Sequence, residues 1–376
     1  MPRDVPQPIG LYVHVPFCAS KCAYCDFASY AGRAADMPRY VEAVVREIER
    51  RGELAGHPRA DTVFLGGGTP SLLDEIHIAR ILEALFQSFV IEPAAEITCE
   101  CNPGTLTAAF VRMIRGAGVN RLSLGAQASQ SRLLRLIGRI HNWGEAIASM
   151  EFARAAGFDD INLDLMFGLP TQTVADWQEM LLAAVELSPT HLSCYGLIVE
   201  EGTPICRDID AGKLALPEEE TERQMYELAR QTLAEHGFHQ YEISNFARPG
   251  HECRHNIGCW TRVPYLGFGA AAHSFFDDRR IMNPAGLDDY LAGEPPRTEA
   301  ISNEEARFES LMLGLRMTRG VRDEDFTRMH GTSIVVAFGE KLDKPIRAGL
   351  LEWRDGALRL TRAGMDLQNS VLVDLM

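Results

Sequence analysis

The chain has 376 residues and carries 52 Asp and Glu against 37 Lys and Arg, which gives a formal net charge of −15 at pH 7. This acidic balance argues against broad binding to a nucleic-acid backbone, so no nucleic-acid partner is expected. No apolar run is long enough to cross a bilayer, and the opening "MPRDVPQPIG" lacks the apolar region of a secretory signal. We therefore expect a cytoplasmic protein with reduced thiols and at most transient membrane contact.

Apolar strand patterns alternate with helical patterns over the first 240 residues. The predicted strands cover residues 11–15, 62–67, 96–101, 121–127, 160–168 and 191–197. Helices are predicted around 38–51, 74–88, 107–116, 144–157, 173–187 and 217–236. Six such βα units indicate an α/β fold in which helices cover a parallel sheet. A closed or partly closed barrel fits better than an open sheet, because every unit ends in a polar or glycine-rich loop. In such barrels the reactive groups gather on the loops that follow the strands.

The pattern changes twice after residue 240. Residues 241–300 are predicted to form a loop-rich extension, in which "YEISNFARPGHECRHNIGCW" is the most distinctive part. From 301 to 376, an amphipathic helix in "EEARFESLMLGLRMTRG" and a hairpin turning at Asp355-Gly356 predict a small winged-helix-like α+β domain. Acidic and basic residues nearly cancel there, so DNA binding is the weaker use for this domain.

Three cysteines lie close together directly after the first predicted strand. In "VHVPFCASKCAYCDF", Cys18, Cys22 and Cys25 follow the spacing C-x3-C-x2-C. Thiolates suit zinc and iron–sulfur clusters, but structural zinc favours four ligands that close the site. A cubane cluster held by three cysteines leaves one iron open to an outside ligand. The spacing therefore favours such a cluster, with incidental or zinc-binding cysteines as the alternative.

The segment "CASKCAYC", with an aromatic residue at Tyr24, resembles the signature of the radical S-adenosylmethionine (radical SAM) superfamily. The resemblance implies a 4Fe–4S cluster on the three cysteines, whose open iron takes the amino and carboxylate groups of S-adenosylmethionine. It also implies that an electron, delivered by flavodoxin or a ferredoxin, cleaves the sulfonium to give a 5′-deoxyadenosyl radical. The fold that it implies for residues 1–240 is a partial (βα)6 TIM-type barrel.

Polar or glycine-rich positions at the other strand ends match the cofactor motifs of this superfamily. "GGGTPS" resembles the GGE-type motif that holds the methionine amino group; its N–H groups can receive a carboxylate, and a tight βα turn is the alternative explanation. Asp164 stands in the apolar strand "INLDLMFGLP", where a charge costs free energy unless a ligand or a salt bridge inside the barrel compensates it. The resemblance assigns the following residues to the cofactor site: Tyr12, Tyr24, Gly67, Gly68, Thr69, Glu100, Gln127, Arg139 and Asp164.

Motifs along most of the chain, among them "LYVHVPFC", "RLSLGAQ" and "GFGAAAHS", resemble the coproporphyrinogen dehydrogenase (HemN) group, including a HemN-type C-terminal domain at 301–376. The dehydrogenases of that group carry a fourth cysteine two residues after the third and a long N-terminal segment. This chain has Phe27 at that position and only 17 residues before Cys18. Both departures favour the HemW-type branch, whose members are regarded as heme-binding chaperones.

The segment "HNIGCW" resembles the H-N-x-x-Y-W motif of that branch, with Cys259 in place of the tyrosine. Imidazole and thiolate are both ligands of heme iron, so His255 is the first candidate ligand and Cys259 the second. Two alternatives stay open. His255 caps a loop and hydrogen-bonds backbone, or Cys253, His255 and Cys259 form a small metal site of their own.

The resemblance implies a heme chaperone that binds heme and passes it to an acceptor hemoprotein, such as a respiratory one. The alternative is oxygen-independent oxidative decarboxylation of coproporphyrinogen III to protoporphyrinogen IX, which Phe27 makes the weaker reading. A third hypothesis, modification of a nucleic acid by a radical enzyme, is disfavoured by the acidic charge.

Overall fold

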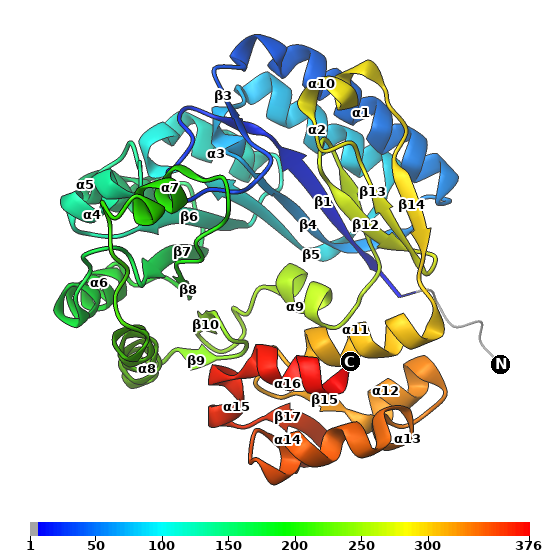
Figure 1. Cartoon of the computed structure of the whole chain (residues 1–376). Helices are drawn as coiled ribbons and strands as arrows, with labels where there is room; N and C mark the ends of the chain where they lie inside the picture. The colour runs from blue at the N-terminus through cyan, green and yellow to red at the C-terminus, as the bar shows by residue number, and fades with distance from the viewer. Residues whose placement is uncertain (1–6) are drawn as a thin grey trace.

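The computed structural model describes residues 7–376. The first six residues, which belong to the opening segment in which no secretory signal is predicted, lie outside the described residues. Six parallel strands form the centre of the molecule, in the order in which the chain makes them (Figure 1). They are β1 (Ile9–Val15), β4 (Arg59–Gly67), β5 (Val90–Cys101), β6 (Arg121–Gln127), β7 (Asp160–Phe167) and β8 (His191–Gly196). Their side chains are mostly buried on both faces, as expected for parallel strands.

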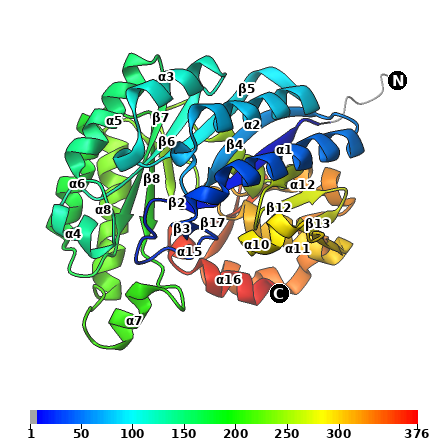
Figure 2. The ribbon, with the colours of Figure 1, turned by 90° about the horizontal axis from the view of Figure 1, so that it is seen from above.

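A helix follows each of these strands and covers the outer, convex side of the sheet (Figure 2). The six are α1 (Met37–Leu54), α2 (Glu75–Ser88), α3 (Ala108–Gly116), α5 (Trp143–Ala155), α6 (Val174–Glu186) and α8 (Glu219–Glu235). All six predicted βα units are thus confirmed. Short elements add to the connections: β2 (Phe17–Cys18), β3 (Tyr30–Ala31), α4 (Ser131–Leu136), α7 (Pro204–Asp210) and the 3₁₀ turns η1 (Ala34–Asp36), η2 (Pro70–Leu72) and η3 (Pro103–Thr105).

The six strands form a partial barrel, as predicted, because its edge strands do not pair with each other. β8 pairs with the antiparallel β10, and β1 pairs with the parallel β11, which gives a sheet of 12 strands. The strands that extend it are β9 (His239–Gln240), β10 (Asn245–Ala247), β11 (Tyr265–Phe268), β12 (His273–Phe276), β13 (Arg279–Met282) and β14 (Arg297–Ala300). The same segment also forms two helices, α9 (Arg254–Trp260) and α10 (Leu287–Ala292).

Residues 241–300, predicted to be rich in loops, contain short helices and strands joined by many turns, and one of these strands, β11, lies beside β1 in the central sheet. Strands of two to four residues are too short to show the two-residue alternation by which a strand is recognised in sequence.

The C-terminal part has its own three-stranded sheet and its own hydrophobic core, which includes Leu311, Phe326 and Leu358. Its elements are α11 (Asn303–Gly314), β15 (Val321–Arg322), α12 (Asp323–His330), α13 (Ile334–Phe338), η4 (Gly339–Leu342), α14 (Asp343–Arg347), β16 (Leu351–Arg354), β17 (Ala357–Leu360), α15 (Arg362–Asp366) and α16 (Gln368–Leu375). The predicted hairpin turns at Asp355 and Gly356, both at positive φ (50° and 78°), the signature of a two-residue type I′ turn.

Helix α9 lies between the central sheet and the C-terminal part, where it contacts β4 on one side and α11 on the other (Figure 1). The guanidinium of Arg316 lies over the ring of Trp260 at 4.4 Å, and Nη2 of Arg316 donates to the fully buried Glu242 at 3.3 Å. No helix among residues 7–376 is both long and apolar enough to span a membrane.

Candidate functional site

The three clustered cysteines lie on the loop that follows β1, and all three thiols are free and partly exposed. Each thiol has a polar neighbour. The hydroxyl of Thr69 donates to Sγ of Cys18 at 3.6 Å, Nη1 of Arg139 donates to Sγ of Cys22 at 3.6 Å, and Sγ of Cys25 lies 3.9 Å from Oγ of Ser29. Two residues that the sequence assigned to the cofactor site thus contact the cysteines directly.

The geometry does not favour a site for a single metal ion. Among residues 7–376, no three Cys, His, Asp or Glu side chains converge as ligands of one ion. Neither the three clustered cysteines nor Cys253, His255 and Cys259 form such a group in the described residues. In a cubane cluster each thiolate binds a different iron, so its sulfur ligands lie further apart than the ligands of one ion.

His14 holds the cysteine loop against β1, and sequence reasoning did not single it out. Its Nε2–H donates to the carbonyl of Ala28 at 2.8 Å, and its Nδ1 accepts from the hydroxyl of Tyr12 at 2.9 Å. Burial lowers the pKa of His14, which keeps the ring neutral as these two bonds require. The available signal was spacing, because residues two apart on a strand point to the same face and Tyr12 was already a candidate.

Tyr24 fixes the loop from its other side. Its ring packs in a cluster with Ile137 and Ile205, and the backbone of the neighbouring Ala23 bonds both residues. The N–H of Ala23 donates to the carbonyl of Ile137, and the N–H of Ile205 donates to the carbonyl of Ala23, each at 2.9 Å. The aromatic residue before Cys25 therefore contributes to positioning the loop.

The glycine turn after β4 packs directly against the cysteine loop. Gly67 has φ of 106°, and a Cβ there would lie 2.4 Å from the ring of His14; a Cβ on Gly68 would lie 2.7 Å from the carbonyl oxygens of Val15 and Phe17. Both N–H groups already have partners: Gly67 donates to Oε2 of Glu100 at 3.0 Å and Gly68 to the carbonyl of Val15 at 2.8 Å. The carboxylate that this turn receives is thus the protein's own, and a ligand would meet its carbonyls and Thr69.

Two carboxyl groups face the inside of the partial barrel without a cationic partner. Burial, together with the charge of Asp164, raises the pKa of Glu100 to about 8. Asp164 accepts from Oγ of Ser123 at 3.0 Å and from Nδ2 of Asn162 at 2.8 Å, and burial raises its pKa as well. Neither carboxyl forms a salt bridge within residues 7–376, so the salt bridge considered for Asp164 is absent there. A cationic ligand such as a sulfonium would stabilise both charges.

Gln127 and Arg139 meet above Gly125 at the end of β6. A Cβ on Gly125 would lie 2.9 Å from Nη2 of Arg139 and 3.1 Å from Nε2 of Gln127. Arg139 also donates from Nη2 to the carbonyl of Gly125 at 2.6 Å, and thereby spans from this strand end to Cys22. The structure thus gathers these side chains, Thr69 and Glu100 at the carboxyl ends of the strands, beside the cysteines.

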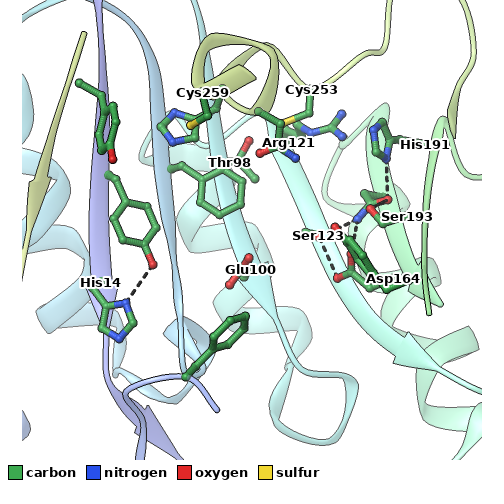
Figure 3. Close-up of a pocket in the computed structure, with 18 of the residues that line it drawn as sticks. His14, Thr98, Glu100, Arg121, Ser123, Asp164, His191, Ser193, Cys253 and Cys259 are labelled. Carbon is green, nitrogen blue, oxygen red and sulfur yellow. Dashed lines mark hydrogen bonds between the residues drawn. The ribbon is translucent and has the colours of Figure 1, made fainter. Parts of the chain in front are cut away.

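A cavity of about 510 Å³ extends from the cysteine loop to α9 along the concave side of the sheet (Figure 3). Such a volume is typical of sites for small organic ligands. One wall carries aromatic rings, among them Tyr12, Phe64 and Tyr265, and the opposite wall carries the polar groups around Asp164. The amino-terminal ends of the strands and α9 form the far end.

His255 lies at this far end, on the first turn of α9. Oε1 of Glu96 accepts from its backbone N–H at 2.9 Å, and its Nδ1 lies 3.0 Å from the hydroxyl of Thr62. The ring stacks on Phe64 with centroids 5.1 Å apart. Nε2 has no hydrogen-bond partner in residues 7–376. The imidazole therefore bonds a side chain rather than backbone, unlike the loop-capping alternative.

The two candidate heme ligands share the far end of the cavity in their uncharged forms. Burial lowers the pKa of His255 to about 4, so its imidazole is neutral, the form that binds a metal. Cys259 follows one turn later on α9, and burial raises the pKa of its thiol to about 11. Of the two, His255 is the ligand that needs no deprotonation at neutral pH.

Comparison with known proteins assigns the chain to a family. The sequence model of the radical SAM superfamily matches residues 12–184, and that of the HemN C-terminal domain matches residues 301–367. A Bacillus subtilis protein named heme chaperone HemW is 37% identical over 369 residues, which cover 96% of this chain and 97% of the relative. The chain belongs to the HemW family. A HemW of Synechocystis is 40% identical over 84% of this chain and 79% of the relative.

A solved structure extends the likeness to the fold of the whole chain. Escherichia coli coproporphyrinogen III oxidase (HemN), a radical SAM enzyme, superposes with a TM-score of 0.86 at 23% identity, covering 100% of this chain and 91% of the other. At that identity the likeness concerns the fold alone. In this member of the HemW family, Phe27 is 67% exposed on the cysteine loop and also lines the cavity.

A polar network that sequence reasoning missed connects the wall of the cavity to the residue before α9, and Figure 3 shows the part of it that lies between His191 and Asp164. Nδ1–H of His191 donates to Oδ1 of Asn162 at 2.7 Å, and Asn162 in turn donates to Asp164. The hydroxyl of Tyr241 donates to Nε2 of His191 at 2.8 Å and accepts from the N–H of Cys253 at 3.3 Å. The inner face of the sheet is thereby bonded to the residue that precedes α9.

Proposed function

We propose that this protein is a heme chaperone of the radical SAM type, working in the cytoplasm, which binds heme and passes it to an acceptor hemoprotein. The observation that carries the proposal is the similarity to proteins named heme chaperone HemW over nearly the full length of both chains. The proposed division is a radical SAM region (1–240), an extension (241–300) that carries α9, and a C-terminal domain (301–376).

The donor set at the cysteine loop fits a 4Fe–4S cluster with S-adenosylmethionine at its open iron. Cys18, Cys22 and Cys25 would hold the cluster, with Arg139 and Thr69 donating to two of the sulfurs. When bound, the cluster supplies one-electron chemistry to the sulfonium, with flavodoxin or a ferredoxin as the electron donor.

The nucleotide ligand would lie between the glycine turn and the inner wall. The carboxyls of Glu100 and Asp164, which have no ion-pair partner among the described residues, would face its cationic groups. Gln127 at the end of β6 and Arg139, which contacts that strand end, would bind its polar atoms. Tyr12, Tyr24, Gly67, Gly68 and Thr69 complete the proposed contacts. This arrangement places the charge of the ligand where the protein offers buried carboxyls without a cation.

Heme would be bound at the other end of the cavity with His255 as its first candidate ligand. Ligation through Nε2 requires the tautomer in which Nδ1–H donates to Thr62, and such a second partner is usual for metal-binding histidines. Cys259 is the second candidate, because it lines the same cavity. The aromatic wall offers an apolar face to a flat macrocycle.

The heme test is a titration of the anaerobically purified protein with hemin, followed by visible absorption. We expect one heme per chain, with an axial-ligand spectrum that changes in His255→Ala. His273→Ala serves as the matched control, because His273 also lines the cavity but is exposed. If His255→Ala keeps the affinity and the spectrum, the ligand is another residue, and Cys259→Ser is the next variant to measure.

The cluster test is reconstitution with iron and sulfide under anaerobic conditions. We expect about four iron and four sulfide per chain in the wild type. Cys22→Ala should lose the brown colour and both elements. A full cluster in that variant would show that the ligand set is wrong.

The alternative function is oxygen-independent dehydrogenation of coproporphyrinogen III, which the similarity of fold to the HemN enzyme makes worth testing. Phe27 opposes it, because it stands where the dehydrogenase branch has a fourth cysteine. An anaerobic assay with coproporphyrinogen III decides, since efficient decarboxylation would replace the chaperone proposal.

A further inference from the structure

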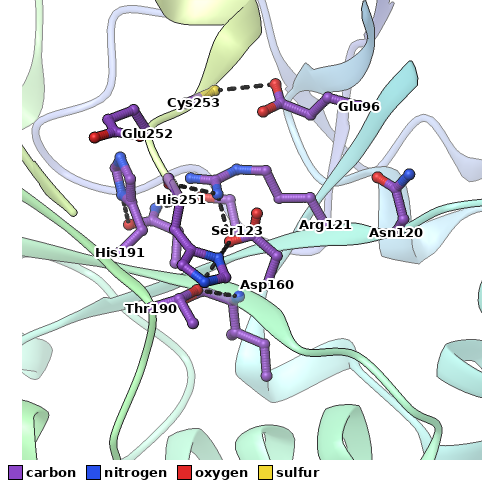
Figure 4. Close-up of polar contacts among 12 residues, drawn as sticks. Glu96, Asn120, Arg121, Ser123, Asp160, Thr190, His191, His251, Glu252 and Cys253 are labelled. Carbon is purple, nitrogen blue, oxygen red and sulfur yellow. Dashed lines mark hydrogen bonds and ion pairs between the residues drawn. The ribbon is translucent and has the colours of Figure 1, made fainter. Parts of the chain in front are cut away.

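Arg121 is a buried cation at the far end of the cavity. It opens the motif "RLSLGAQ", but neither the resemblance nor the proposed function gives it a role. It opens β6, is only 2% exposed, and is among the residues that line the cavity. Its Nη1 donates to Oδ1 of Asp160 at 2.6 Å and to the carbonyl of His251 at 3.3 Å (Figure 4). Both N–H donors of Nη1 thus have an acceptor.

The other two nitrogens of Arg121 have donors to spare. A guanidinium offers five N–H donors, and Nε and Nη2 of Arg121 make no hydrogen bond in residues 7–376. Neither atom is fully buried, and Arg121 is among the residues that line the cavity. A donor that lacks a partner in a largely buried position costs free energy, which makes a polar ligand or water at these atoms favourable. The half-buried Arg51 differs, since it bonds protein groups with both Nη1 and Nη2.

No other cation competes for an anion in this cavity. Arg121 is the only Lys or Arg among the residues that line it in the described part of the chain. The neighbouring His191 is neutral, because both ring nitrogens are used in the network and burial lowers its pKa far below the usual value. The carboxylate partner Asp160 is shared, since the hydroxyl of Thr190 also donates to it at 2.8 Å.

The position of Arg121 decides whether it can reach the carboxylate of a ligand at the cysteine loop or only one at the far end of the cavity. Gln127 ends the same strand beside the cysteine loop, and seven residues of strand span about 20 Å. A methionine carboxylate bound near Cys22 would therefore lie at Arg139, not at Arg121. The carbonyl of His251, which Arg121 holds, lies four residues before His255, so the guanidinium and the imidazole share one end of the cavity.

We propose that Arg121 binds a propionate of the heme whose iron faces His255, and so sets the orientation of the macrocycle in the cavity. The planar fork of Nε and Nη2 suits two parallel hydrogen bonds to one carboxylate. This inference rests on the proposed heme-binding function. It assigns a specificity for tetrapyrroles with free acid side chains, and it predicts discrimination against esters.

The experiment compares hemin with hemin dimethyl ester, in which both propionates are blocked. For the wild type we expect the ester to bind roughly tenfold to a hundredfold more weakly, the range for hydrogen bonds to a charged group. Arg121→Gln should lose a similar factor for hemin and no longer distinguish the two ligands. The matched control is Thr190→Val, which removes another hydrogen bond to Asp160 and should discriminate as the wild type does.

Each result separates this inference from the proposed function. Equal affinity of the wild type for hemin and its ester would overturn the role of Arg121 and leave heme binding intact. Failure of hemin to bind the wild type would overturn both. If Arg121→Gln does not fold, the comparison of the two ligands on the wild type still decides. If Arg121→Gln weakens binding of S-adenosylmethionine instead of hemin, the carboxylate belongs to the nucleotide and the proposal is wrong.

Discussion

Replacing Glu100 by glutamine keeps the size of the side chain and removes its charge, so it tests how much this carboxyl lowers the free energy of unfolding. Burial and Asp164 raise the pKa of Glu100 from 4.5 to about 8. At pH 7 the folded protein therefore holds a proton that the unfolded chain releases. Below pH 4.5 the raised pKa leaves the free energy of unfolding unchanged. Above pH 4.5 it lowers the free energy of unfolding, by an amount that grows until about pH 8.

The size of the effect follows from the shift. Each pH unit between the two pKa values is worth about 1.4 kcal/mol, so the carboxyl costs up to about 3 kcal/mol at pH 7. Part of Glu100 faces water in the cavity, which screens its charge, and the expected net cost is about 1–2 kcal/mol. Glu100→Gln should thus unfold at higher urea concentration than the wild type at pH 7, and at nearly the same concentration at pH 5.

The assay is urea unfolding of the cluster-free protein, followed by circular dichroism at pH 5, 7 and 8.5 in the presence of reductant. Glu92→Gln is the control on the same strand, because the guanidinium of Arg59 lowers the pKa of Glu92 and removing that charge brings no gain. A Glu100→Gln protein no more stable than the wild type at pH 7, with an unchanged pH dependence, would refute the argument that Glu100 is held protonated.

Three further predictions concern the ligands. Binding of S-adenosylmethionine at pH 7 should release up to about one proton from Glu100 and should tighten as pH rises to about 8, because the cation favours the carboxylate. Calorimetry in two buffers of different ionisation enthalpy measures the proton release. A binding enthalpy that does not depend on the buffer would contradict this prediction. Thr62→Val should weaken heme binding about tenfold by freeing the ring of His255, and an unchanged affinity and spectrum would exclude this role of the hydroxyl. Gly68→Ala should displace the cysteine loop, lower the stability by about 1–3 kcal/mol and lower the iron and sulfide content. The control is Gly116→Ala, where an added Cβ meets nothing within 4 Å. Equal iron content in both variants would contradict the prediction.

The elements that sequence predicts best here are the long ones. Strands of six to 12 residues and helices of nine to 18 give enough repeats for their periodicity to be recognised, and all six βα units followed from it. The periodicity says nothing about where edge strands end up. That β11 pairs with β1 depends on a contact between segments about 250 residues apart, which no local pattern encodes.

In the site, too, local sequence motifs predict some residues, while others depend on contacts between distant segments. Residues inside recognisable motifs, such as Cys18 and Thr69, lie together at the strand ends. Asn162 and His191 escaped prediction because their roles arise only when β7 and β8 bring their side chains side by side. His14 was missed although its spacing from Tyr12 on the same strand was a usable signal. Arg121 escaped for a related reason, since the spare donors of its guanidinium are visible only once its actual partners are known.

We expect this protein to hold heme rather than to decarboxylate a porphyrinogen. Both activities can be measured in one anaerobic preparation with a reconstituted cluster, S-adenosylmethionine and a chemical reductant. The expected result is one tightly bound heme per chain and no protoporphyrinogen IX from coproporphyrinogen III. Sustained formation of protoporphyrinogen IX by a preparation that retains no heme would contradict it.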